Sequence, residues 1–387
     1  MKVAHVITRM ILGGAQENTL LTCEGLHARG HEVSLITGPP LGPEGELMER
    51  AQAGGYEVLL VNSLRRAVNP VRDWRAYRAL GRLLLRLAPD VVHTHSSKAG
   101  ILGRRAADHL RKKGGGALAG MKIVHTIHGL PYHRYNSFPA NWLYVALERR
   151  AARRSDAIIS VADAMTRQAL AAGVGTPEQY TTIYSGMEVA DFLTRPAGAD
   201  GFRRSLGLGG DDVLVTQVSR LAELKGHDFI LDAAARIANP RVQFCFVGDG
   251  RRRARIERAI RAAHLEGRVH LTGLLPPEQI PLIMHASDIV VHCSLREGLA
   301  RALPQAMLAG KPVVSFDVDG AAEVVGSDTG VLLEPGDVGG LKTAIESLSK
   351  APDLRRRLGE HGRDRARQRF DHNLMVEQIE ALYRRIA

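Results

Sequence analysis

Short apolar runs alternate with amphipathic segments along most of this chain. In the first half, the amphipathic segments carry apolar residues every three or four positions, at Ala15–Arg29, Val71–Leu87 and Ala99–Lys112. The apolar runs lie at Lys2–Thr8, Glu32–Thr37, Tyr56–Val61, Val91–Thr94, Met121–Thr126 and Ala157–Val161. This alternation predicts a parallel sheet that is covered by helices on both faces.

The same alternation starts again in the second half and ends in helical patterns at Leu354–Arg369 and His372–Ile386. Its apolar runs are Asp212–Val218, Val242–Val247, Arg268–Leu271, Ile289–His292, Pro312–Phe316 and Gly330–Leu332. The segment Asp191–Gly210 is rich in Gly, Pro and Asp and has no clear period, so we expect a linker there. The predicted fold class is α/β, with two doubly wound, Rossmann-like domains and an interdomain cleft at the carboxyl ends of their strands.

The positive charge of the chain is concentrated in its first half. The net charge is +11, and residues 1–195 contain 25 Lys and Arg against 16 Asp and Glu, which gives +9. Residues 196–387 contain 27 against 25, which gives +2. This excess predicts an anionic partner for the first half, such as a phospholipid surface, a lipid-linked diphosphate or a nucleic acid.

The cysteines and the hydropathy indicate where the protein works. Cys23, Cys245 and Cys293 are far apart and form no CxxC pair, which favours a reducing compartment. His5 and Arg9 interrupt the first apolar run, so we expect no signal peptide, and no run reaches the roughly 18 apolar residues of a membrane span. We expect a cytoplasmic protein that is at most peripheral on the inner face of a membrane.

Two cations follow the first apolar run of the second half. Arg220 and Lys225 come after Asp212–Val218, and Lys225-Gly226 precedes a helical pattern. Cations at a strand end beside a helix start favour binding of a phosphate. The alternative is a pair of solvated side chains, in a chain that contains 52 Lys and Arg.

A carboxylate follows the run Ile289–His292. We expect Glu297 to lie directly before a helix and Gln305 to lie two turns further on, near the same face. The unpaired amides at the helix start would come from Gly298, Leu299, Ala300 and Arg301. These amides would bind an anion and Glu297 would bind sugar hydroxyls, unless Glu297 only caps the helix.

Gly13-Gly14 and His128 follow strands in the first half. A Gly pair at a helix start allows close approach of a ligand. The spacing is not GxGxxG and no acidic residue ends the second strand, which disfavours a dinucleotide-binding dehydrogenase. His128 is predicted at a strand tip, where it would donate to a sugar hydroxyl or to charge that develops during a reaction.

Three further groups suggest chemistry that we disfavour. His93 and His95 share a strand face, as zinc ligands would, but no Cys or carboxylate is near them at metal spacing. The acidic triplet Asp317-Val318-Asp319 would suit a divalent metal, yet Asp is an ordinary turn residue. His292 and Cys293 are adjacent on a strand and point to opposite faces, so they cannot form a nucleophile and its base. We predict no metal site.

Together these motifs resemble those of the GT-B glycosyltransferases, specifically glycosyltransferase family 4, which retains anomeric configuration. The resemblance covers essentially the whole chain. It rests on Gly13-Gly14-Ala15-Gln16 (family GGA(E/Q)), Thr126-Ile127-His128-Gly129, Tyr184-Ser185-Gly186-Met187-Glu188 with Phe192 (N-G-(I/V)-D…F), Ser219-Arg220-Leu221…Lys225-Gly226 (G-R-L…K-G), Val247-Gly248-Asp249-Gly250 (V-G-(D/E)-G) and Glu297…Gln305 (E-x7-E).

The resemblance implies an acceptor-binding domain at residues 1–192, a nucleotide-sugar-binding domain at residues 193–370, and a last helix, 371–387, that crosses back onto the first domain. It implies that Arg220 and Lys225 hold the diphosphate, that Glu297 contacts the donor sugar, and that the amides of residues 299–301 meet the phosphates. Residues near Gly248 and Leu275 would line the base. Two departures are Gln305, where the family has a Glu that binds ribose, and Ser219, where it has Gly.

The activity expected from this resemblance is metal-independent, retaining transfer of a sugar from a nucleotide-sugar, UDP-linked, to a glycan or glycolipid acceptor in cell-envelope polysaccharide synthesis. The nucleotide-sugar is a substrate, so no cofactor is expected. The predicted catalytic residues are His128, Glu297, Arg220 and Lys225. The alternatives are a sugar-nucleotide epimerase or hydrolase on the same fold, a non-catalytic membrane scaffold, and a protein that binds nucleic acid or another anionic polymer. The aromatic content of 5% disfavours nucleic acid.

Overall fold

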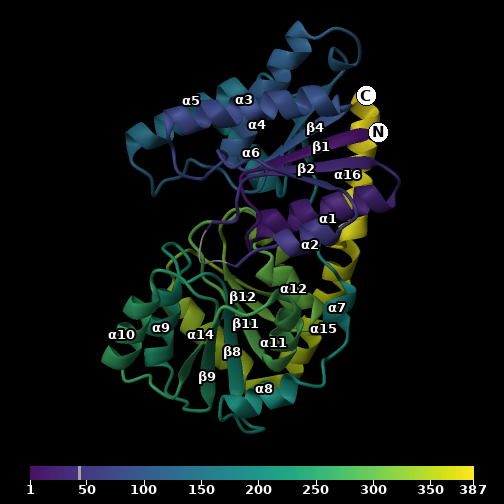
Figure 1. Ribbon diagram of the computed structural model, residues 1–387. Coiled ribbons are helices and arrows are strands. Elements are labelled where there is room, and N and C mark those ends of the chain that lie inside the picture. Colours follow the sequence, from purple (N-terminus) through teal and green to yellow (C-terminus); the bar gives the residue numbers. More distant parts are fainter. Residues whose placement is uncertain (42–44) are drawn as a thin grey trace. The chain divides into compact units, whose positions relative to one another are not determined.

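The computed structural model describes residues 1–41 and 45–387, which divide into two compact units (Figure 1). Met1–Gly186 and His372–Ala387 form the N-terminal unit, and Met187–Asp371 forms the C-terminal unit. The division lies at Gly186, whereas the sequence placed it at residue 192. No helix in the described ranges combines the length and apolar character that a membrane crossing requires.

A parallel sheet forms the centre of the N-terminal unit. Over the described residues its strand order is β3-β2-β1-β4-β5-β6-β7. The strands are β1 Lys2–Ile7, β2 Glu32–Thr37, β3 Glu57–Leu60, β4 Val91–His95, β5 Lys122–Ile127, β6 Ala157–Ser160 and β7 Tyr180–Thr182. The sequence predicted all of these except β7, whose three residues include no aliphatic side chain and are only half-buried.

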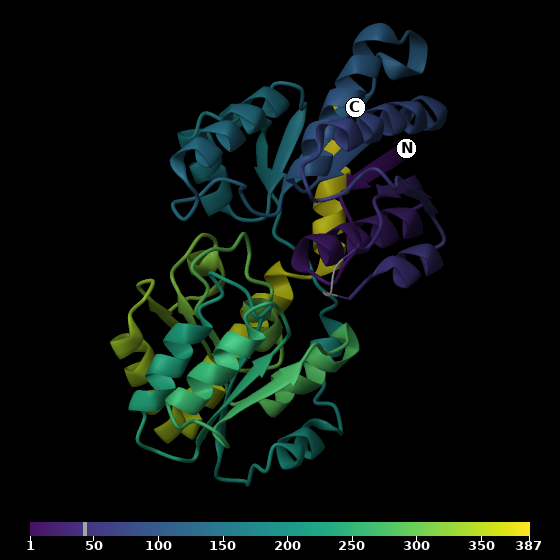
Figure 2. The same cartoon turned by 60° about the vertical axis from the view of Figure 1, so that its left-hand side comes forward.

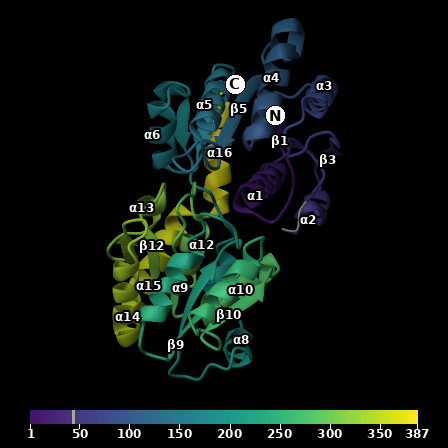
Figure 3. The same ribbon diagram turned by 90° about the vertical axis from the view of Figure 1, so that its left-hand side faces the viewer.

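Helices cover both faces of this sheet, as Figures 1 and 3 show. Val3 and Ile7 of β1 belong to a core that includes residues of α1 and α16, whereas Ala4 and Val6 belong to a core that includes residues of α3 and α4. The helices are α1 Gly14–Ala28, α2 Met48–Ala53, α3 Pro70–Leu87, α4 Ser97–Lys113, α5 Phe138–Ala152, α6 Asp163–Ala171 and α16 His372–Ile386. Because both faces are covered, most strand residues are buried, and the buried polar residues among them include His5 and His93.

The last helix of the chain, α16, packs against α1 and the N-terminal sheet (Figure 1). Gly25 of α1 allows this contact, because a Cβ at that position would lie 2.6 Å from Cγ2 of Val376. Glu380 of α16 accepts a hydrogen bond from Arg29 and pairs with His31 at 3.0 Å. The helix is therefore part of the first unit although it follows the second in sequence.

The C-terminal unit has a second parallel sheet, and Figure 2 shows it between its helices. Among the described residues its strand order is β10-β9-β8-β11-β12-β13. The strands are β8 Val213–Val218, β9 Val242–Val247, β10 Val269–Gly273, β11 Ile289–His292, β12 Val313–Phe316 and β13 Gly330–Leu333. All six match predicted apolar runs. The two helix-covered parallel sheets confirm the predicted α/β, doubly wound fold class.

The helices of this unit also cover both faces, with α9, α10 and α14 on one side and α8, α11, α12 and α15 on the other (Figure 1). They are α7 Ala190–Leu193, α8 Ala199–Ser205, α9 His227–Arg236, α10 Arg253–Ala262, α11 Ile280–Ala286, α12 Ala302–Leu308, α13 Ala321–Val324, α14 Val338–Lys350 and α15 Pro352–Arg369. The segment 191–210, which we expected to be a linker, instead contains α7 and α8. They are too short to show a helical period in the sequence, but α8 packs against α11.

Candidate functional site

Two loops of the C-terminal unit, residues 219–226 after β8 and residues 293–301 after β11, follow adjacent parallel strands. The main-chain oxygen of Leu224 accepts hydrogen bonds from the amide of Leu295 at 2.8 Å and from Oγ of Ser294 at 3.0 Å. Gly226 has a φ of 75°, and a Cβ there would lie 1.8 Å from the carbonyl oxygen of Cys293. Only Gly permits this close approach, which brings Lys225 next to the second loop.

Lys225, Glu297 and His292 form a compact polar cluster at this end of the sheet. Nζ of Lys225 lies 2.5 Å from Oε1 of Glu297, and Nε2 of His292 lies 3.0 Å from the same oxygen. The side chains of Lys225, Glu297 and His292 are 19%, 15% and 6% exposed, so solvent screens the ion pair only in part.

The carboxyl of Glu297 is held in its charged form. Burial alone would raise its pKa, but the charge of Lys225 and the hydrogen bond from His292 outweigh burial and lower the pKa well below its usual value. Because a carboxylate only accepts hydrogen bonds, His292 must donate from Nε2. Glu297 is thus a fixed anion with one oxygen bound to two donors.

The helix predicted to begin directly after Glu297 begins later, at Ala302, so that prediction was wrong. Oδ2 of Asp319 accepts a hydrogen bond from the amide of Glu297 at 2.6 Å, and the amide of Gly320 donates to the carbonyl of Gly298 at 3.3 Å. These contacts hold residues 297–298 against the turn after β12, so these residues do not join the helix. Gly298 also has a low helix propensity. Glu297 is therefore neither a helix cap nor on the same helix face as Gln305.

The delayed helix start leaves three consecutive main-chain N–H groups of this loop without an acceptor among the described residues. In the described part of the chain, the main-chain N–H groups of Gly298, Leu299 and Ala300 donate to no protein acceptor. Arg301 is half-buried at the start of α12, and Arg220 is exposed on the facing loop. Consecutive free amides beside cationic side chains make a site for an anion.

Other predicted residues of this unit lie around the same strand ends. Gly248 follows β9 with a φ of 134°, and a Cβ there would lie 2.2 Å from the carbonyl oxygen of Ser219. Leu275 follows β10 and packs against a cluster of buried residues that includes Leu214, Val247 and Ile283. Gln305 is half-buried on α12.

The remaining predicted residues, Gly13, Gly14 and His128, belong to the N-terminal unit. Gly13 precedes α1 with extended backbone, Gly14 is the first residue of that helix, and His128 follows β5. His128 contacts another ring, with its Nε2 at 3.1 Å from Nδ1 of His95.

From the sequence we did not expect His292 and Asp319 to help hold this site together. His292 was considered only as a partner for Cys293, although a polar residue that ends a buried strand next to a carboxylate was a usable signal. Asp319 was weighed as a metal ligand and assigned to a turn. It does lie in a turn, with a φ of 52°, but its carboxylate also holds the loop of Glu297.

Comparison with known proteins identifies the family of this chain. The family model "Glycosyl transferase 4-like domain" matches residues 13–186, and "Glycosyl transferases group 1" matches residues 199–365. The 2-deoxystreptamine N-acetyl-D-glucosaminyltransferase of Streptomyces fradiae is 30% identical over 93% of this chain and 90% of its own length. The UDP-Gal:alpha-D-GlcNAc-diphosphoundecaprenol alpha-1,3-galactosyltransferase of Escherichia coli is 28% identical over 89% of this chain and 87% of its own length.

Solved structures share the fold over the full length. The Anabaena protein HepE in complex with UDP-glucose superimposes with a TM-score of 0.83, at 24% identity, over 99% of both chains. WaaG, a glycosyltransferase of lipopolysaccharide biosynthesis, gives a TM-score of 0.78 at 19% identity over 99% of both chains. This chain is a glycosyltransferase and belongs to the GT-B glycosyltransferases of family 4.

Proposed function

We propose that this glycosyltransferase moves a sugar, with retention of configuration and without a metal, from a UDP-sugar to a hydroxyl of a glycan or glycolipid in cell-envelope polysaccharide synthesis. The observation that carries the proposal is the Lys225–Glu297–His292 cluster beside the free amides of residues 298–300. The choice of UDP is supported by the galactosyltransferase relative, whose name specifies UDP-Gal, and by the fold relative in complex with UDP-glucose.

The diphosphate of the donor would lie against the cationic loops. Arg220 and Lys225 would neutralise its charge, and the amides of Gly298, Leu299 and Ala300 would donate to its oxygens. During transfer, the bond between the anomeric carbon and the β-phosphate oxygen breaks, and negative charge grows on the diphosphate. Donors that are already in place stabilise that charge without reorganisation.

Glu297 would bind hydroxyls of the donor sugar. Its second oxygen, Oε2, remains as an acceptor when Oε1 is bound by Lys225 and His292. Lys225 would thereby link the sugar-binding carboxylate to the diphosphate. Gln305 would accept a hydrogen bond from the ribose, and Gly248 and Leu275 would line the base.

Three residues of the N-terminal unit are also proposed to contact the substrates. Gly13 and Gly14 would allow the donor to approach the backbone at the start of α1, and His128 would donate a hydrogen bond to the sugar. These three assignments rest on their positions at strand ends and on the family motifs that they match.

Retention without a protein nucleophile fits the chemistry of the C-terminal site. Burial raises the pKa of the Cys293 thiol, which makes it a poor nucleophile, and Glu297 is held by two donors. In a front-face route, the acceptor oxygen bonds to the anomeric carbon on the side that the diphosphate leaves, and the acceptor proton passes to a diphosphate oxygen.

Activity assays with the full chain test this proposal. UDP-, GDP- and ADP-sugars should be offered in EDTA with two acceptors, an N-acetylglucosaminyl diphosphate lipid and 2-deoxystreptamine, the acceptor class of the 30% identical relative. We expect transfer from a UDP-sugar to the lipid-linked glycan, with an α-linked product from an α-linked donor by NMR. Inversion at the anomeric carbon, or activity only with a divalent metal, would contradict the corresponding part of the proposal.

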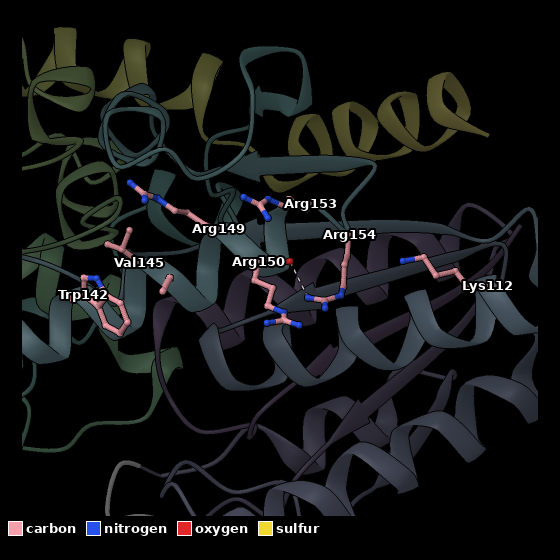
Figure 4. Close-up of a pocket in the computed structure, with 8 residues that line it drawn as sticks. Lys112, Trp142, Val145, Arg149, Arg150, Arg153 and Arg154 are labelled. Atoms are coloured by element: carbon pink, nitrogen blue, oxygen red, sulfur yellow. Dashed lines mark hydrogen bonds between the residues drawn. The ribbon is translucent and has the colours of Figure 1, made fainter.

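The helix α5 and its neighbourhood support a peripheral position on an anionic membrane. A pocket of about 690 Å³ is lined by Lys112, Trp142, Val145, Ala146, Arg149, Arg150, Arg153 and Arg154 (Figure 4). Within it, Arg154 donates to the main-chain oxygen of Arg150 at 2.8 Å. The start of the helix exposes large apolar side chains, with Phe138 82%, Trp142 67% and Leu143 49% exposed. Apolar side chains next to a basic pocket suit the headgroup region of anionic lipids.

Sedimentation with phospholipid vesicles tests this contact. We expect the protein to bind phosphatidylglycerol vesicles and to release them at high salt, and Arg150→Ala/Arg153→Ala to weaken binding several-fold. The matched control is Arg258→Ala/Arg261→Ala, which removes two exposed charges from α10 in the other unit. Equal binding by both double variants would contradict the membrane contact.

A further inference from the structure

A row of histidine rings lies on the face of the N-terminal sheet that α1 and α16 cover. His5 is in β1, His95 is in β4 and His128 follows β5, and these three strands are neighbours. The register pairs His5 with His93 and His95 with Thr126. Since side chains two apart in a strand share a face, strand order and register bring all of these rings together.

Two hydrogen bonds connect three of these rings. Nδ1 of His5 lies 3.0 Å from Nε2 of His95, and Nδ1 of His95 lies 3.1 Å from Nε2 of His128. His93, the other ring of β4, contacts the hydroxyl of Tyr383 at 2.5 Å and Oγ1 of Thr126 at 2.7 Å, so both of its nitrogens are used outside this series.

The rings of His5 and His95 are neutral at physiological pH. Burial lowers the pKa of His5 to about 3, and burial together with the neighbouring histidines lowers the pKa of His95 well below its usual value. A neutral imidazole has one N–H donor and one acceptor nitrogen. Both hydrogen bonds must therefore point the same way, either from His5 towards His128 or from His128 towards His5.

The surroundings of Nε2 of His5, at the end of the series opposite His128, decide between these two directions. Nε2 of His5 is buried and has no hydrogen-bond partner within the described residues. If the bonds pointed towards His5, this atom would carry a buried proton with no acceptor. If they point towards His128, it carries only a lone pair. An orphaned buried N–H is the rarer and more costly of the two.

We propose that His5 and His95 are positioning residues that hold His128 in the tautomer with its proton on Nδ1. His5 donates from Nδ1 to His95, and His95 donates from Nδ1 to Nε2 of His128. The ring of His128 then carries its proton on Nδ1, and its Nε2 accepts the hydrogen bond from His95. The consequence for catalysis rests on the proposed function, in which His128 donates to the donor sugar or to developing negative charge.

The test is a measurement of tautomers in the full chain labelled with ¹⁵N-histidine. Long-range ¹H–¹⁵N NMR near pH 8 distinguishes Nδ1–H from Nε2–H, and the spectra of His128→Gln and His5→Asn assign the signals. We expect His5, His95 and His128 all to carry the proton on Nδ1. Protons on Nε2 of His95 and His128 would overturn the proposal. Addition of Zn²⁺ should leave these signals unchanged, and loss of the protons to bound zinc would overturn it as well.

A matched pair of variants tests the consequence for His128. His5→Asn keeps an N–H near the position of Nδ1, whereas His5→Phe keeps the bulk and removes the donor. We expect His5→Phe to give His128 a mixture of tautomers and to lower kcat about tenfold, with His5→Asn near wild type. Equal spectra for both variants would contradict the relay, and the wild-type spectrum decides alone if His5→Phe does not fold.

The experiment separates this inference from the proposed function. An unchanged kcat for His128→Ala would remove His128 from the reaction but leave the tautomer assignment intact. An Nε2-protonated His128 in the wild type would refute the relay but leave sugar transfer intact.

Discussion

Nζ of Lys225 lies 2.5 Å from Oε1 of Glu297, although the two residues are 72 positions apart and belong to loops after different strands. The pair joins the carboxylate proposed to bind the donor sugar to the cation proposed to bind the diphosphate. A donor that bridges them would contact both side chains at once. The ion pair also holds each side chain in place relative to the other.

Lys225→Ala should lower kcat/KM by about 10²-fold, because it removes a charge that stabilises the diphosphate and leaves Glu297 without its cation. Steady-state kinetics with the donor that the activity assays identify measures this loss. Lys342→Ala is the matched control, since Lys342 pairs with Glu346 at 2.9 Å on α14, away from the site. Similar kinetics for the two variants would contradict the assignment of Lys225.

His292→Phe should lower kcat/KM about tenfold or more, because a hydrogen bond to a charged group is lost. His292→Gln should recover much of the rate, since its amide nitrogen can reach the position of Nε2 and donate to Glu297. The comparison requires kinetics of both variants with the same donor. If Gln and Phe have the same effect, the hydrogen bond to Glu297 has no part in transfer.

Asp319→Ala should raise the KM for the donor about tenfold, because the amide of Glu297 loses its acceptor and Ala disfavours the φ of 52° at this position. Asp319→Asn should have a small effect, since Asn keeps an oxygen acceptor and tolerates left-handed backbone.

Substitutions of Asp317 and Asp319 also distinguish a structural turn from a site that binds a divalent metal. Asp317→Asn and Asp319→Asn would both abolish activity if the two carboxylates held a divalent metal. Near-normal rates for both in the presence of EDTA are the expected result.

The histidine row makes the stability of the protein sensitive to acid. The pKa of His5 is about 3 in the folded protein and 6.5 in the unfolded chain, so the unfolded chain binds more protons between these values. The stabilisation is complete above pH 6.5 and is lost as the pH falls towards 3, by about 1.4 kcal/mol per pH unit. Urea unfolding followed by circular dichroism should therefore show a smaller loss between pH 6.5 and pH 5 for His5→Phe than for wild type. Equal losses would contradict the burial of a neutral His5.

Much of the fold could be predicted from the sequence, because the strands of a helix-covered parallel sheet are apolar on both faces and stand out as short runs. β7 could not, since Tyr180–Thr182 is short and half-buried. The start of α12 was placed too early because contacts from Asp319 and Gly320, which follow a different strand, override the local pattern. His5 was seen only as a polar interruption, because its contact with His95 depends on strand order and register.

The proposed function depends on binding of a nucleotide diphosphate by the C-terminal unit, at Arg220, Lys225 and the amides of residues 298–300. A crystal structure of the full chain with UDP tests it most directly. We expect the β-phosphate within hydrogen-bond distance of Lys225 and of at least two of these amides, with Arg220 turned towards it. A diphosphate bound elsewhere, with Arg220 in solvent and Lys225 still paired only with Glu297, would contradict the claim.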